Sequence, residues 1–158
     1  VIHRNVSPSN LIQRTEDGVV KLCDLMLAKS LEGANAEQLT AAGEVVGEIS
    51  YMSPEQLVDP SKVDWRSDQY GLGATLYALL TGRAQFEATT IEERIRAFQQ
   101  DVGTFPAEVQ SEGNPEFLSI VLRMLANSRE DRFASPRQML ERLHHLGKQL
   151  NITVVYKR

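Results

Sequence analysis

Residues 3–10 read His-Arg-Asn-Val-Ser-Pro-Ser-Asn, and Asp24-Leu25-Met26 begins fourteen residues after Asn10. Two short apolar runs lie between them, at 11–14 (Leu-Ile-Gln-Arg) and 19–23 (Val-Val-Lys-Leu-Cys). Glu16-Asp17-Gly18 separates these runs and is a turn signal. The pattern predicts a small β-hairpin with the polar stretches at its two ends.

The rest of the chain predicts helices after one long loop at 27–50, where small and acidic residues show little periodicity. Cap residues followed by proline, glutamine or glutamate mark the helix starts. The most apolar candidate is apolar around most of its circumference and ends at Thr81-Gly82, which suits a central, buried helix. The predicted helices begin at Ser53-Pro54 and span 66–80, 90–99, 114–126 and 135–150.

The fold class expected from these elements is mainly α, with one small hairpin near the N-terminus. We expect one unit over residues 1–150 and a short tail at 151–158. The formal net charge of −4 and pI of about 5.4 argue against nucleic-acid or anionic-membrane binding. No apolar run approaches the ~20 residues that span a bilayer, and no signal peptide is recognised, so we expect a cytoplasmic location.

Five segments resemble signatures of the serine/threonine protein kinase family, in the order that the family has them. Residues 3–10 resemble the catalytic loop H-R-D-[LV]-K-P-x-N at six of eight places, and 24–26 resemble D-F-G or D-L-G. Residues 47–55, 66–73 and 129–133 resemble G-T-P-x-Y-M-[AS]-P-E, R-S-D-[IV]-Y-S-L-G and P-x-x-R-[FP]. The resemblance implies the helical C-terminal lobe of the protein-kinase fold.

The resemblance also implies a role for each matched residue, with ATP and Mg²⁺ as the cofactors of active relatives. Two residues would supply oxygen ligands to Mg²⁺. Others would hold the catalytic loop, receive an activation-loop phosphate, or form a buried ion pair. These are the metal-side Asn10 and Asp24, His3 packing under the loop, Arg4 as phosphate receiver, Asp68 accepting loop amides, and the Glu55–Arg132 pair.

The departures from the family pattern gather on the chemistry. Asn5 replaces the aspartate that accepts the substrate proton, and loss of such a general base costs about 10²–10⁴ in rate. Ser7 replaces the lysine that contacts the transferred phosphoryl group, a loss of about 10²–10³. Glu48 replaces the threonine that, in serine/threonine kinases, bonds to that aspartate and that lysine. Met26 replaces the glycine after Asp24. The phosphotransfer arrangement is therefore expected to be dismantled.

The N-terminal lobe of a kinase has no counterpart in this sequence. No G-x-G-x-x-G occurs, and no V-A-I-K-like strand supplies a lysine. The sequence is then a fragment of a longer protein or a truncated product. A truncated product would expose apolar surface and is expected to self-associate, whereas a fragment has the missing N-lobe as its partner.

Three functions follow from these observations. The first is a pseudokinase or scaffold that binds a protein partner, with this chain inactive by itself. The alternatives are an active, ATP-dependent serine/threonine kinase whose N-lobe lies outside this chain, and a truncated remnant without function. Ser30 and Thr40 are candidate phosphosites in the long loop, with Arg4 as the receiver.

Overall fold

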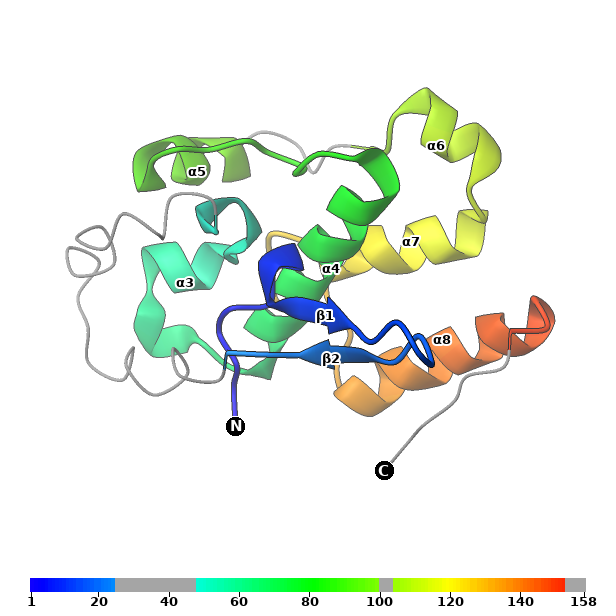
Figure 1. Cartoon of the computed structure of the whole chain (residues 1–158). Helices are drawn as coiled ribbons and strands as arrows, with labels where there is room; N and C mark the ends of the chain where they lie inside the picture. The colour runs from blue at the N-terminus through cyan, green and yellow to red at the C-terminus, as the bar shows by residue number, and fades with distance from the viewer. Residues whose placement is uncertain (25–47, 100–103, 153–158) are drawn as a thin grey trace.

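The computed structural model describes residues 1–24, 48–99 and 104–152 of the chain. Within these ranges the protein is mainly helical with one two-stranded sheet, which confirms the predicted fold class. Figure 1 shows α4 running through the middle, with α3 and α5 on one side and α7 and α8 on the other. The hairpin lies against the middle of the molecule and carries the polar stretch of residues 3–10 beside α4.

The hairpin consists of β1 (Leu11–Gln13) and β2 (Val20–Leu22), paired antiparallel with Leu11 opposite Leu22. A short 3₁₀ helix, η1 (Pro8–Asn10), leads into it. The connecting turn closes because Gly18 adopts a positive φ of 69° and donates to the carbonyl of Arg14 at 2.9 Å. The hairpin predicted from the sequence is confirmed.

The central helix α4 (Trp65–Thr81) begins at Asp64, whose side chain accepts from the backbone N–H of Arg66. It ends at Gly82, which takes a left-handed conformation with φ 73° and supplies the expected helix stop. Tyr70 and Thr75 are fully buried, as predicted for a central helix. The prediction is wrong for the last turn, where Leu79 is 66% exposed.

Two glycines let α4 approach its neighbours closely. A Cβ on Gly71 would lie 2.8 Å from the carbonyl oxygen of Val6, which belongs to the 3–10 stretch. A Cβ on Gly73 would lie 2.8 Å from the Cβ of Met124 on α7 (Pro115–Met124). Both distances are shorter than real side-chain contacts, so α4 is pressed between the 3–10 stretch and α7.

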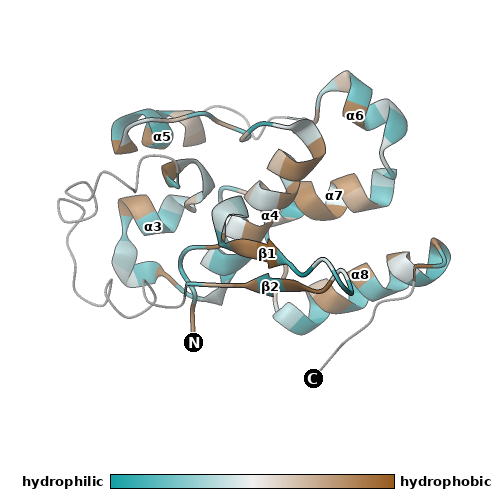
Figure 2. Cartoon of the chain, viewed as in Figure 1, coloured by the Kyte–Doolittle hydropathy of each residue, from teal (hydrophilic) through white to brown (hydrophobic). Residues whose placement is uncertain are grey.

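The surrounding helices start at the cap residues that the sequence predicted. Capping boxes join Ser53 with Gln56 and Thr90 with Glu93. Figure 2 shows brown, apolar residues concentrated on the central elements and teal residues on the outer helices. The helices are α3 (Pro54–Val58), α5 (Ile91–Phe98), α7 as above and α8 (Pro136–Gln149).

Besides η1, three further elements were not predicted. They are the helix α6 (Ala107–Glu112) and the 3₁₀ helices η2 (Ile49–Tyr51) and η3 (Pro60–Lys62). The predicted long loop at 27–50 is therefore too long, because its last residues turn into η2 and bury Ile49 and Ser50. The remainder of that loop lies outside the described residues. No helix in the described ranges is long and apolar enough to cross a membrane.

Arg94 of α5 is buried in a way that the sequence did not indicate. Its side chain is fully buried, and its Nη2 donates to the hydroxyl of Tyr70 at 2.7 Å. The guanidinium also lies over the rings of Phe98 and Phe86, at 4.5 and 5.3 Å from their centroids. Burial lowers the pKa of Arg94 from its ordinary value, and the contact with Tyr70 partly offsets this.

Candidate functional site

The 3–10 stretch, called the 3–10 loop below, is fixed to the central helix by its backbone. The N–H groups of His3 and Arg4 donate to the two carboxylate oxygens of Asp68, at 2.8 and 2.7 Å. The carbonyl of Arg4 accepts from Nε2 of Gln56 on α3, at 2.7 Å. Arg4 has a positive φ of 67°, an uncommon conformation for a residue with a side chain. These three hydrogen bonds offset the cost of that conformation.

His3 connects the loop to the residue that follows β2 at the base of the hairpin. Its Nε2 lies 2.9 Å from the carbonyl of Cys23, so this nitrogen carries the proton. Its Nδ1 then accepts from the backbone N–H of Asn5 at 3.3 Å. The imidazole is 6% exposed and spans two segments twenty residues apart. His3 therefore orders the loop through backbone atoms of Cys23 and Asn5.

A second network joins three of the four positions where the sequence departs from the kinase pattern. Asn5 donates from Nδ2 to Oε2 of Glu48 at 2.6 Å. Oε1 of Glu48 accepts from the hydroxyl of Ser9 at 3.0 Å, and Ser9 lies 2.8 Å from the hydroxyl of Ser7. The structure thus brings Asn5, Ser7 and Glu48 together through Ser9, which the sequence did not single out.

This network has no carboxylate at position 5 and no cationic side chain at position 7. The Asn5 amide has no useful basicity, and the hydroxyl of the fully buried Ser7 carries no positive charge. The one ionisable group is Glu48, and both of its oxygens already accept hydrogen bonds. The site therefore carries a carboxylate, but on the segment opposite the loop.

Asn10 and Asp24 lie next to each other at the base of the hairpin. The backbone N–H of Cys23 donates to the carbonyl of Asn10 at 2.8 Å, which aligns the two strand ends. Nδ2 of Asn10 donates to the carbonyl of Asn5 at 2.9 Å, so the amide oxygen remains for another partner. Asp24 is exposed and holds a φ of 63°.

These two residues fit a magnesium ion by donor type. Mg²⁺ prefers oxygen ligands and commonly takes one or two from the protein, with the rest from phosphates and water. The described residues contain no group of three or more His, Cys, Asp or Glu side chains that would hold a metal without such help. Asn10 and Asp24 would therefore hold a metal only together with a phosphate-bearing ligand.

Glu55 and Arg132 form a buried ion pair that ties α3 to the segment before α8. Two parallel hydrogen bonds of 2.7 and 2.9 Å join the guanidinium to the carboxylate, and Ser67 of α4 donates to the same carboxylate at 2.7 Å. Burial raises the pKa of Glu55, but Arg132 and Ser67 outweigh this effect, and the pKa ends below its ordinary value. The pair positions α3, whose Gln56 in turn holds the carbonyl of Arg4.

Some residues singled out in the sequence lie outside the described residues. These are Met26 and the candidate phosphosites Ser30 and Thr40. Arg4, their expected receiver, is partly buried, and its Nε has no hydrogen-bond partner among the described residues. The phosphosite assignment stays a prediction.

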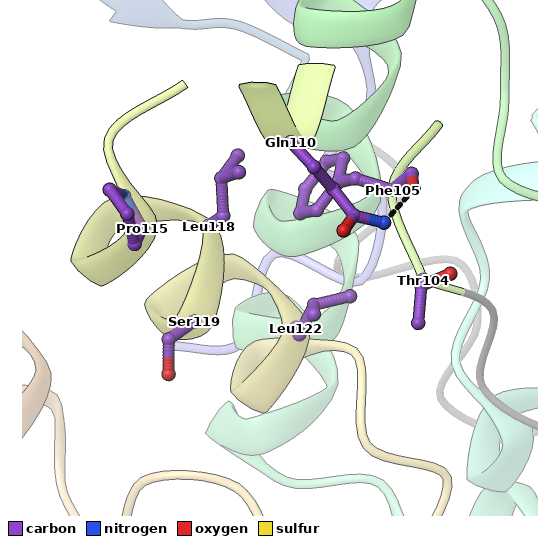
Figure 3. A pocket seen from close by; sticks show the side chains of 7 residues that line it. All are labelled: Thr104, Phe105, Gln110, Pro115, Leu118, Ser119 and Leu122. Atoms are coloured by element: carbon purple, nitrogen blue, oxygen red, sulfur yellow. Dashed lines mark hydrogen bonds between the residues drawn. The ribbon is translucent and has the colours of Figure 1, made fainter. Parts of the chain in front are cut away.

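Two hollows lie outside the network of Asn5, Ser7, Ser9 and Glu48. One is a cavity of about 310 Å³ between α6 and α7, lined by residues such as Phe105, Leu118 and Leu122 (Figure 3). Figure 3 shows Gln110 donating to the carbonyl of Phe105 at its edge. The other is a groove of about 400 Å³, with walls from the hairpin, α4 and α8 that include Leu22 and Met139. Neither contains a residue of the Asn5–Glu48 network.

Two residues of the site were missed in the sequence. Ser9 occupies the variable place of the catalytic-loop pattern, so nothing marked it as the bridge between Ser7 and Glu48. Gln56 was recognised as a helix-capping residue, and its additional bond to Arg4 depends on tertiary packing. The only signal for either was its position next to a matched motif.

The fold and the site define the helical lobe of a protein kinase, with the loop, the hairpin and the central helix in the expected places. The sequence model of the protein kinase domain matches residues 1–145. The chain belongs to the protein kinase domain family.

Bacterial serine/threonine kinases are among its relatives. The chain is 36% identical over 136 residues to the probable serine/threonine-protein kinase PknB of Bifidobacterium longum, covering 85% of this chain and 19% of that protein. It is 31% identical over 151 residues to the serine/threonine-protein kinase PknL of Mycobacterium tuberculosis, covering 95% of this chain and 36% of the relative. A probable kinase of Clostridium acetobutylicum is 29% identical over 146 residues, covering 92% and 22%. The chain thus spans about a fifth to a third of the curated relatives that it matches.

Proposed function

We propose that this chain is a serine/threonine kinase-like domain with impaired phosphoryl transfer, which acts by binding a protein partner. The observation that carries the proposal is the Asn5–Glu48 hydrogen bond of 2.6 Å. The Asn5 amide occupies the position where active relatives need a carboxylate base, and the carboxylate of Glu48 is bound to that amide.

The absence of a positive charge at position 7 supports the same proposal. Phosphoryl transfer relies on charges positioned before the reaction, because little covalent chemistry falls to the protein. Ser7 is fully buried and bonded to Ser9, so its side chain offers the phosphate neither charge nor reach. Losses at positions 5 and 7 affect one catalytic unit, and their costs do not simply multiply.

The metal side favours a second candidate, an active kinase completed by an N-lobe outside this chain. Among the described residues none donates to the amide oxygen of Asn10, and Asp24 is an exposed residue with a carboxylate. ATP with Mg²⁺ would be the ligand of these residues, as in active relatives, and the metal would supply charge neutralisation of the phosphates.

Of the two candidates we propose the first. The site keeps metal–nucleotide recognition in the full-length protein and has lost efficient phosphoryl transfer.

The test compares nucleotide binding with phosphate transfer in the full-length protein. We expect Mg²⁺-dependent binding of a fluorescent ATP analogue that Asp24→Ala weakens, together with transfer from radiolabelled ATP at background level. Transfer that is well above background and lost in Asp24→Ala would replace the proposal with the active-kinase candidate. The cytoplasmic location and the partner stay proposals of the same kind, and neither affects this test.

A further inference from the structure

The carboxylate of Glu48 connects two segments that are far apart in the sequence. Its Oε2 accepts from Nδ2 of Asn5 and its Oε1 accepts from the hydroxyl of Ser9, 43 and 39 residues away. Both bonds run from the 3–10 loop to the residue that caps η2. A single side chain thus holds the start of the 48–56 segment against the loop at two points.

The contact also determines which atom of Asn5 remains available. An ionised carboxylate only accepts hydrogen bonds, so the nitrogen of the Asn5 amide must face Glu48. The backbone N–H and C=O of Asn5 are taken by His3 and Asn10. Among the described residues, none donates to Oδ1 of Asn5. In this orientation Oδ1 of Asn5 is a neutral hydrogen-bond acceptor, whereas an aspartate at position 5 would present a charged one.

This inference rests on the proposed function. We propose that Glu48 is a positioning residue, whose carboxylate fixes the orientation of the Asn5 amide and keeps the 48–56 segment against the 3–10 loop. This docking needs no covalent modification of the chain. The amide–carboxylate hydrogen bond here has its carboxylate at position 48 and its amide at position 5. Exchanging the amide and carboxylate groups between the two positions would therefore make the same type of bond with donor and acceptor reversed. Either half of the exchange alone would not.

The two single substitutions differ in a way that the bond explains. Asn5→Asp places two carboxylates in contact, which removes the donor and adds like-charge repulsion. Glu48→Gln leaves two amides that still form a neutral hydrogen bond, about half as strong as the charged one. Asn5→Asp with Glu48→Gln restores a charged bond between an amide donor and a carboxylate acceptor.

Hydrogen–deuterium exchange of the full-length protein tests the proposal. We expect Asn5→Asp to accelerate amide exchange in residues 48–53 by roughly tenfold or more, the loss that a bond to a charged group implies. The double variant should return to within about threefold of the unmodified protein. Glu48→Ala should accelerate exchange as well, and serves where Asn5→Asp fails to fold. Glu87→Gln, an exposed carboxylate in a loop, is the control and should change nothing.

The proposal is overturned if the double variant exchanges as fast as Asn5→Asp, or if Glu48→Ala behaves like Glu87→Gln. Phosphate transfer by the unmodified protein is a separate measurement. Asp24-dependent transfer would contradict the proposed function and leave the exchange result standing. An unrestored double variant would contradict the role of Glu48 and leave the proposed function standing.

Discussion

Arg132 holds Glu55 through two parallel hydrogen bonds of 2.7 and 2.9 Å, and both side chains are buried. The guanidinium also donates to the carbonyls of Arg66 and Ala126, at 2.9 Å each. One side chain therefore joins α3, the start of α4 and the segment after α7. The 3–10 loop depends on this junction because Gln56 of α3 holds the carbonyl of Arg4.

Removal of Arg132 is expected to destabilise the protein strongly. Arg132→Ala leaves Glu55 as a buried charge without its partner, and breaking a buried pair from one side costs about 3–5 kcal/mol in the free energy of unfolding. Urea denaturation measures this cost. Arg137→Ala removes one partner of the exposed pair with Glu141 and should have little effect. Similar midpoints for the two variants would contradict the assigned importance of the buried pair.

The same pair predicts acid destabilisation. The pKa of Glu55 is lower in the folded protein than its ordinary value of 4.5, because the contacts with Arg132 and Ser67 outweigh burial. A lowered folded pKa contributes stability above the unfolded pKa, and this contribution is lost as the pH falls through the folded value. We expect unfolding free energies that decline below about pH 4.5, with a smaller decline in Glu55→Gln. Equal declines in both proteins would assign the effect to other carboxylates.

Asp68 is predicted to control the shape of the 3–10 loop. Its two oxygens accept from His3 and Arg4, and Arg4 occupies a positive-φ conformation. Asp68→Ala removes both acceptors at a cost of about 3–6 kcal/mol, since bonds to a charged group contribute about 1.5–3 kcal/mol each. Hydrogen exchange at residues 3–6 should accelerate more than exchange in α8. Uniform acceleration over the whole chain would indicate a general loss of stability instead.

Gly71 is predicted to tolerate no side chain. A Cβ there would lie 2.8 Å from the carbonyl oxygen of Val6, which is backbone and has no rotamer to change. Gly71→Ala should therefore lower the free energy of unfolding by about 1–3 kcal/mol and displace the loop. Chemical shifts of residues 3–10 report the displacement. A fully stable Gly71→Ala protein with an unchanged loop would show that α4 has room to move.

Most helices could be predicted because their start signals are local. Ser53 and Thr90 form capping boxes within one helical turn, so the sequence alone contains both partners. The helix α6 was missed because its first residue follows Pro106, which offers no side-chain cap. The exposure of Leu79 was missed because it depends on which elements cover α4, and hydropathy does not contain that information.

In the candidate site, too, the sequence identified individual positions but not the contacts that depend on tertiary packing. The family resemblance singled out Asn5, Ser7 and Glu48 as departures, each by comparison with one motif position. Their joint network was beyond prediction, since the bond from Ser9 to Glu48 crosses 39 residues and depends on where η2 packs against α4 and α5. A substitution pattern identifies the changed positions, and the fold decides what the new side chains bond to.

The hydrogen bonds of Glu48 to Asn5 and Ser9 affect which substitutions would be needed to restore phosphate transfer. Asn5→Asp with Ser7→Lys tests whether these two departures account for the proposed loss of phosphate transfer in the full-length protein. The structure adds Glu48, whose carboxylate would lie against Asp at position 5 and compete for the new lysine ammonium. The three side chains would then carry a net charge of −1, which repels the phosphates.

Glu48→Thr added to the two substitutions removes that charge and returns a hydroxyl to position 48. We expect the triple variant to transfer phosphate roughly tenfold or more faster than the double variant, part of the 10²–10³ that one positioned charge contributes. Transfer from radiolabelled ATP measures the ratio, and Asp24→Ala in the triple background should abolish it. Equal rates for the double and triple variants would mean that Glu48 moves away once its bond to Asn5 is gone. No transfer by the triple variant would place the defect elsewhere, since every departure within the Asn5–Ser7–Glu48 network would then have been reversed.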